Sequence, residues 1–246
     1  MTHLSGKAAL VTGGGRGIGA AIAKRLAREG ADVAITYAKG KAQAEDVLAE
    51  IKALGRRGLV IAADSADADA VRKAVAEAVK AFGRLDILVN NAGVFPYGPF
   101  EEVSLEEFDR TMAIHARAAF VAAQAASQHM GKGGRIISIG SNLGERVPHP
   151  GVSLYAMSKS ALIGFTRGLA RDLGERGITV NLVQPGSTAT DMNPAEGESA
   201  DAQRALTALG HYGSADDIAA TVVHLAGEGA RQITGAAILV DGGANA

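Results

Sequence analysis

Seven short apolar runs alternate with longer amphipathic stretches along the 246 residues, and this alternation constrains the fold more than any other feature. The runs contain little polar alternation, which is typical of parallel strands covered by helices on both faces. The pattern predicts an α/β fold with a doubly wound parallel sheet. The expected strands are Ala8–Thr12, Val33–Tyr37, Leu59–Ala63, Ile87–Asn91, Arg135–Gly140, Ile178–Val183 and Ala236–Val240.

Helical stretches lie between these strands, and several carry end signals. Ser104 to Glu107 reads as a capping box, and Gly30 and Gly177 stand where helices should end. We find no linker or internal repeat, so residues 1–246 are predicted to form one domain, with a polar, irregular segment at about 187–213 as a lid over a site. The expected helices are Gly17–Glu29, Lys41–Leu54, Asp67–Phe82, Leu105–Met130, Leu154–Glu175 and Ala215–Ala226.

The composition argues against several classes of protein, although a local charged patch stays possible. A net charge of −1 gives no sign of a surface for nucleic acid or anionic membrane, and no apolar run is long enough to span a bilayer. The start of the chain is too polar for a signal peptide, and the absence of cysteine fits a reducing compartment, so we expect a cytoplasmic protein. The histidines are scattered, so no metal site is expected.

A glycine-rich loop, Thr12–Gly19 ("TGGGRGIG"), joins the first strand to the first helix. Glycines there allow a sharp turn, so that a pyrophosphate can approach the free amide N–H groups at the helix start. We therefore expect Gly13, Gly17, Ile18 and Gly19 to bind a dinucleotide. The spacing differs from the standard G-x-G-x-x-G fingerprint, and a purely structural turn is the alternative.

The second strand ends without the carboxylate that would bind a ribose 2′-hydroxyl and repel a 2′-phosphate. It ends at Tyr37, with Lys39 and Lys41 just beyond, and Arg16 lies inside the glycine loop. These cations favour NADP(H) over NAD(H). The alternative is that they are solvated surface charges, which suits Lys41 better than Arg16.

Six motifs occur in a fixed order along nearly the whole chain: "TGGGRGIG", "NNAG" (Asn90–Gly93), Ser141, "YAMSK" (Tyr155–Lys159), "PG" (Pro185–Gly186) and "DGG" (Asp241–Gly243). Together they resemble the short-chain dehydrogenase/reductase family, and most closely its 3-oxoacyl-acyl-carrier-protein reductases and related carbonyl reductases. The resemblance implies a seven-stranded Rossmann sheet, a nicotinamide cofactor and a homotetramer, or a homodimer.

Tyr155 and Lys159 lie one helical turn apart, on the same face of the predicted helix. A nearby ammonium and an oxidised nicotinamide both favour the phenolate, so the Tyr155 pKa is expected to fall from its usual value of about 10. Tyr155 would then donate a proton to a carbonyl as hydride arrives, or accept one in the reverse direction. The resemblance implies that Lys159 also binds the nicotinamide ribose.

Ser141 follows the fifth strand, where a hydroxyl can stabilise a developing oxyanion. The segment from Ser141 to Tyr155 is one residue longer than the common family pattern. Asn142 would restore the spacing but has no hydroxyl, and Ser138 should lie within the strand. We therefore predict Ser141 as the catalytic serine, with a serine that only caps the backbone as the alternative.

His115 stands where the family usually has an asparagine. The resemblance implies that this asparagine supports, largely through its backbone carbonyl, a water that links the lysine to solvent as a proton relay. Three outcomes are open: the relay persists through the main chain, the imidazole joins it, or the relay is impaired. A histidine that only satisfies ordinary hydrogen bonds is an equal alternative. His115 is therefore included among the candidate catalytic residues.

The resemblance also implies further cofactor contacts. It places Asp64 and Ser65 against the adenine, and it has Asn90 bracing neighbouring strands. Simple loop geometry is the alternative for each. The remaining expected contacts run along the adenosine ribose and the nicotinamide carboxamide: Asn91, Ala92, Gly93, Pro185, Gly186, Thr188 and Thr190.

The substrate is the least constrained feature. Candidate wall residues are Phe95, Pro96, Tyr97, residues 147–152 and the lid, and they suit a ketone of many possible shapes with some apolar character. We expect NADPH-dependent reduction of a ketone or 3-oxoacyl carbonyl. The alternatives are oxidation of a secondary alcohol, which uses the same residues, and a catalytically silent dinucleotide-binding protein.

Overall fold

A computed structural model describes residues 4–246, apart from the side chain of Glu198, and contains a seven-stranded parallel sheet in the order β3-β2-β1-β4-β5-β6-β9. The order reverses between β1 and β4, which creates the crevice where doubly wound sheets bind ligands. The predicted doubly wound fold is confirmed, and each strand lies within two residues of its expected bounds. The strands are β1 (Ala8–Val11), β2 (Asp32–Tyr37), β3 (Gly58–Ala62), β4 (Ile87–Asn90), β5 (Arg135–Ile139), β6 (Thr179–Pro185) and β9 (Ala237–Val240).

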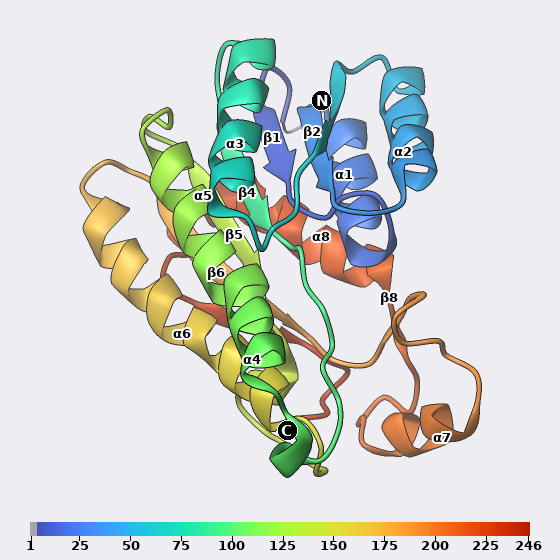
Figure 1. Cartoon of the computed structure of the whole chain (residues 1–246). Helices are drawn as coiled ribbons and strands as arrows, with labels where there is room; N and C mark the ends of the chain where they lie inside the picture. The colour runs from blue at the N-terminus through green and yellow to red at the C-terminus, as the bar shows by residue number, and fades with distance from the viewer. Residues whose placement is uncertain (1–3) are drawn as a thin grey trace.

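Helices cover both faces of the sheet (Figure 1). One core forms where α1 (Gly17–Arg28), α2 (Lys41–Ala53) and α8 (Ala215–Ala226) pack on the sheet. A second core forms on the opposite face beneath α3 (Ala68–Phe82), α5 (Ala118–Ser127) and α6 (Ser153–Gly174). No helix within residues 4–246 has both the length and the apolar character needed to cross a bilayer.

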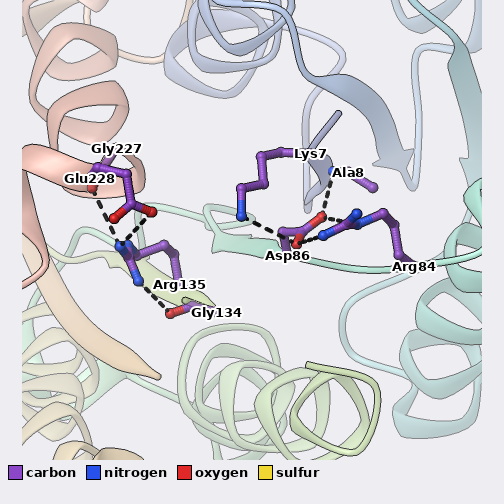
Figure 2. A network of polar contacts seen from close by, with 8 residues as sticks. All are labelled: Lys7, Ala8, Arg84, Asp86, Gly134, Arg135, Gly227 and Glu228. Carbon is purple, nitrogen blue, oxygen red and sulfur yellow. Dashed lines mark hydrogen bonds and ion pairs between the residues drawn. The ribbon is translucent and has the colours of Figure 1, made fainter. Parts of the chain in front are cut away.

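Charged side chains join the strands at the amino-terminal edge of the sheet (Figure 2). Asp86 accepts hydrogen bonds from the Ala8 amide at 2.9 Å and from the Arg84 guanidinium at 2.6 and 2.7 Å, so one carboxylate joins the starts of β1 and β4. Arg135, at the start of β5, is only 3% exposed and donates to the carbonyl of Gly134 at 3.1 Å. These groups lie at the edge opposite the carboxyl ends of the strands.

The helix predicted over Leu105–Met130 is interrupted. It consists of α4 (Leu105–Met112), a π-helical turn η2 (Ala113–Arg117) and α5. In the π turn the Ala118 amide bonds the Ala113 carbonyl, five residues back, so the helix widens by one residue. His115 lies within this turn.

The polar segment at about 187–213 is folded rather than irregular. It contains β7 (Thr188–Ala189), α7 (Glu198–Ala205) and β8 (Gly213–Ser214), and β7 pairs with β8. Figure 1 shows α7 standing away from the main sheet. Three short 3-10 turns complete the described elements: η1 (Phe100–Glu102), η3 (Asn142–Gly144) and η4 (Glu228–Ala230).

Candidate active site

The glycine loop is held in place by two neighbouring strands. Thr36 of β2 accepts a hydrogen bond from the Gly13 amide at 3.0 Å, and the Asn91 side chain donates to the carbonyls of Thr12 and Gly13 at 2.9 and 3.1 Å. A Cβ on Gly19 would lie 2.3 Å from the Gly13 carbonyl oxygen, so this position must be glycine. Asn91 therefore shapes the loop. Thr36 was not predicted from the sequence, although a hydroxyl at the end of the neighbouring strand could have been expected to bind the glycine loop.

The backbone amides at the start of α1 can bind an anion. The N-cap residue Arg16 makes no side-chain capping bond, and the first turn carries no acidic residue. Uncapped amides at a helix start bind phosphate well, so Gly17, Ile18 and Gly19 fit a pyrophosphate. Gly17 has a φ of 53°, and a Cβ there would lie 3.6 Å from Thr190, so the loop faces the segment after β6.

The charged residues expected at the adenosine end differ in their partners. The side chains of Arg16 and Lys39 are exposed, whereas Lys41 forms a 3.5 Å ion pair with Glu45 on its own helix. Asp64 lies 3.3 Å from Arg110. Lys41 is therefore accounted for as a surface charge, while Arg16 and Lys39 fit a phosphate.

The other predicted contacts lie at the carboxyl ends of β4 and β6, on the same edge of the sheet. The Asn90 side chain donates to Ser138 Oγ at 3.4 Å, which matches its expected bracing of β4 against β5. A Cβ on Gly186 would lie 2.6 Å from Asp241 Cβ, and the Thr188 hydroxyl donates to the Gly186 carbonyl at 3.0 Å. The remaining members of this set are Ala92, Gly93, Pro185 and Thr190. Ser65 follows β3 instead, and it is buried.

Ser141 and Tyr155 are brought together at the end of β5. The Ser141 hydroxyl lies near enough to the Tyr155 phenol to lower its pKa by hydrogen bonding, and it also accepts the Leu143 amide at 3.2 Å. Ser138 lies inside β5 and is buried. Of the serines considered, Ser141 is the one whose hydroxyl contacts Tyr155.

Asn142, the extra residue after Ser141, has a separate partner. Its side chain donates to Asn245 Oδ1 at 3.3 Å, and the Asn245 side chain donates to the Asn142 carbonyl at 2.9 Å. On the other side, Gln184 of β6 donates to the Ser141 carbonyl at 3.2 Å. The main chain around the serine is therefore held by residues far away in the sequence, and no sequence signal indicated Asn245.

Lys159 is 5% exposed, and its ammonium donates to the Ile139 carbonyl at 3.0 Å. Burial lowers the pKa of Lys159 to about 8. Its Nζ lies 5.7 Å from the centre of the Tyr155 ring, on the same helix face as predicted. The lysine is therefore a buried cation behind the phenol.

Burial raises the pKa of Tyr155, and the hydrogen bond from Ser141 offsets only part of that rise. We expected the Tyr155 pKa to fall because of Lys159 and an oxidised nicotinamide. When the groups of the protein act without the nicotinamide, that expectation is wrong. Desolvation of the phenolate is the larger of the two effects on this pKa.

His115 is buried between the turn after β4 and α6. Its Nε2 accepts the Val94 amide at 2.9 Å, and its Nδ1 lies 2.7 Å from Ser158 Oγ. Its ring lies 5.8 Å from that of Tyr155. In the part of the chain that the structure describes, no three His, Asp or Glu side chains gather in a way that could hold a metal ion.

Comparison with known proteins agrees with this geometry. Residues 13–245 match a family model described as enoyl-(acyl carrier protein) reductase. A short chain dehydrogenase from Burkholderia cenocepacia, solved in complex with NADP, is 61% identical with a TM-score of 0.98, over 99% of this chain and 100% of its own. The chain belongs to the short-chain dehydrogenase/reductase family.

Other known proteins are similar to this chain over almost their whole length. A short chain dehydrogenase/reductase of Aspergillus aculeatus, AacuN, is 42% identical over 98% of this chain and 96% of its own. The cyclic-di-GMP-binding biofilm dispersal mediator protein of Escherichia coli is 44% identical over 98% of both chains. The family assignment made from the ordered motifs is thus confirmed.

Proposed function

We propose that this chain catalyses NADPH-dependent reduction of a ketone to a secondary alcohol, with Tyr155 as the general acid. The observation that carries the proposal is the contact of the Ser141 hydroxyl with the Tyr155 phenol, in front of the buried Lys159 ammonium. Two hydroxyls then converge on one point, which suits a carbonyl oxygen.

Backbone amides and exposed cations of this chain fit the phosphate groups of the cofactor. The uncapped amides of Gly17, Ile18 and Gly19 would bind the pyrophosphate, and the exposed cations Arg16 and Lys39 would bind the 2′-phosphate. NADPH supplies the hydride when it is bound. The NADP bound by the Burkholderia relative supports the choice of cofactor.

Lys159 and the segment Pro185–Thr190 would orient the nicotinamide half. Lys159 is already placed by the Ile139 carbonyl, so it would present its other N–H donors to the ribose. The bond from Thr188 to Gly186 holds the turn after β6, next to the glycine loop.

Tyr155 would act as the acid because its phenol is protonated at neutral pH and so carries a proton to donate. It would pass that proton to the substrate oxygen as the hydride reaches the carbon, while Ser141 stabilises the developing negative charge. The Lys159 ammonium would then stabilise the phenolate that remains. This proton state favours reduction over the alternative, oxidation of an alcohol, at neutral pH.

The substrate wall beside Tyr155 is aromatic. The Phe95 ring meets the Tyr155 ring edge-on at 4.7 Å, and Tyr97 lies parallel to Phe95 at 6.2 Å. Tyr97 also packs against Gly151, where a Cβ would lie 2.9 Å from the ring, so the two loops form one wall. We propose a ketone with an adjoining aromatic or other apolar group; a 3-oxoacyl thioester is the finer form of this proposal.

The test is a panel of carbonyls with NADPH, followed by the loss of NADPH absorbance. Aryl and alkyl ketones, quinones, sugars and 3-oxoacyl thioesters are the necessary members. Turnover of a ketone supports the proposal. Tight binding of NADPH with no turnover of any carbonyl or alcohol would instead support a silent binding protein, and cyclic di-GMP belongs in the accompanying binding assays because of the Escherichia coli relative.

We also propose that the enzyme is a cytoplasmic homotetramer, as the family resemblance suggests, with a homodimer as the alternative. Light scattering on the purified protein distinguishes the two assemblies. A monomer would contradict both.

A further inference from the structure

His115 occupies a position that leaves its ring little freedom. It lies in the π turn η2 and is 3% exposed, and π turns occur often at functional sites. Both ring nitrogens have protein partners, one on the turn after β4 and one on α6. The ring therefore bridges two separate parts of the active site.

The partners determine which nitrogen carries the proton. The Val94 amide can only donate, so the His115 Nε2 that faces it at 2.9 Å must be the acceptor. A neutral imidazole then holds its proton on Nδ1 and donates it to Ser158 Oγ at 2.7 Å. Ser158 in turn donates its hydroxyl proton to the Tyr155 carbonyl at 2.7 Å. All three bonds run in one direction, from Val94 to Tyr155.

The surroundings disfavour a charged ring. The titratable groups that face it among the described residues are Lys159 and Tyr155, both from α6, and neither is an acid that would attract an imidazolium. Burial, together with the charge of Lys159, lowers the pKa of His115 to about 2. A second proton on Nε2 would also point directly at the Val94 N–H. The ring therefore stays neutral wherever the protein is folded and active.

We propose that His115 is a positioning residue: an uncharged ring, protonated on Nδ1, that ties the turn after β4 to the main chain at Tyr155 and carries no proton during turnover. Its kinetic consequence rests on the proposed reductase function. Of the outcomes left open by the sequence, the imidazole does not join a proton relay.

The two His115 hydrogen bonds join the turn after β4 to α6, and catalysis requires these two parts to keep their relative position. Gly93, next to Val94, packs so closely that a Cβ there would lie 3.2 Å from His115 Nε2 and 3.5 Å from Lys159 Nζ. Phe95, on the other side of Val94, makes the edge contact with the Tyr155 ring. Loss of both His115 bonds therefore frees the aromatic wall and the catalytic helix to shift relative to each other, and a displacement of about 1 Å can lower a rate about 100-fold.

The first experiment reads the proton directly, without substrate. Long-range ¹H–¹⁵N spectra of full-length, ¹⁵N-histidine-labelled protein should show one ring, absent from the His115→Asn variant, that stays neutral with its proton on Nδ1 from about pH 5 to about pH 9, across the normal histidine range. Titration of this ring within that range, or a proton on Nε2, would overturn the proposal. Amide exchange at Val94 is the companion readout and should become faster in His115→Phe.

The second experiment uses variants that keep one bond, or neither. An Asn side chain can take the place of Nδ1 and donate to Ser158. A Gln side chain can take the place of Nε2 and accept from the Val94 amide. Phe keeps a ring but makes neither hydrogen bond. We expect His115→Asn and His115→Gln to keep kcat within about tenfold, and His115→Phe to lose about 100-fold, all with the pH profile of the parent. His129→Phe, at an exposed histidine, is the matched control.

The two proposals fail in different ways. If no carbonyl is reduced with NADPH, the proposed function fails, whereas the ring proton and the exchange at Val94 still decide the role of His115. If His115→Phe keeps the kcat of the Asn and Gln variants, or if any variant loses a limb of the pH profile, His115 is not a positioning residue of this kind.

Discussion

Replacement of Lys159 by Met should make the protein more stable at neutral pH while it removes activity. Lys159 is buried, and its pKa falls from 10.5 when unfolded to about 8 when folded. At about 1.4 kcal/mol per pKa unit, holding the charge costs the folded state about 3 kcal/mol. Met has a similar length and no charge, but it leaves the Ile139 carbonyl without its donor, at a cost of about 1 kcal/mol. The net gain is about 2 kcal/mol.

The sign of the pH dependence follows from the two pKa values. Below about pH 8 the lysine is protonated in both states, so the full cost is present. Between about pH 8 and pH 10.5 the unfolded state binds more protons than the folded state, so the parent protein gains stability relative to Lys159→Met. Above this range the advantage of the variant disappears, and it becomes less stable by about 1 kcal/mol.

The assay is urea unfolding of both proteins at about pH 7 and about pH 10.5, at one protomer concentration because assembly adds to stability. Both proteins carry Tyr155, so its own titration contributes about equally to each. Lys73→Met, at an exposed lysine of α3, is the control and should change stability by no more than about 0.5 kcal/mol. A stability difference that is the same at both pH values would refute the reasoning.

Three further predictions follow from the site. Arg16→Ala should raise KM for NADPH by about tenfold or more and leave KM for NADH nearly unchanged, because a phosphate contact is worth about 1.5–3 kcal/mol; steady-state kinetics with both cofactors measures this, and an unchanged ratio contradicts the assignment. Asn245→Ala should lower kcat by about tenfold with little change in KM for NADPH, because the substitution removes both hydrogen bonds to Asn142, next to Ser141. An unaltered kcat would show that Asn245 is not needed to hold Ser141 in place. Burial raises the Tyr155 pKa, so oxidation of the product alcohol, which needs the phenolate, should accelerate as the pH rises above neutral, while reduction should hold steady until the phenol ionises; pH–rate profiles in both directions test this, and oxidation that is fastest at low pH would contradict it.

The sheet and most helices could be predicted because their signals are local. The run Arg135–Gly140 is mostly apolar, as expected for a central strand buried on both faces, and it matches β5 closely. The break in the helix over Leu105–Met130 gave no such signal, since the residues of the π turn fit an ordinary helix in sequence. His115 could be singled out because it departs from a family pattern, but its two partners could not be named.

Ser141 and Tyr155 could be proposed as a pair from the motif order, but the state of their protons could not be predicted. The sequence shows that Lys159 is one turn from Tyr155, whereas the rise of the Tyr155 pKa depends on burial, which only the folded structure shows. The contact of Asn142 with Asn245 likewise joins residues 103 positions apart. Such long-range bonds arise from the topology of the sheet and leave no local mark in the sequence.

The most direct test of the proposed chemistry is kcat for ketone reduction by Tyr155→Phe, measured beside its NADPH affinity. Phe keeps the ring against Phe95 and His115 and removes only the hydroxyl that we propose as the proton donor. We predict that kcat falls by about 100-fold or more, the usual contribution of a general acid, while NADPH still binds with nearly the parent affinity. A folded variant that keeps the parent kcat would contradict the role of Tyr155 as the acid.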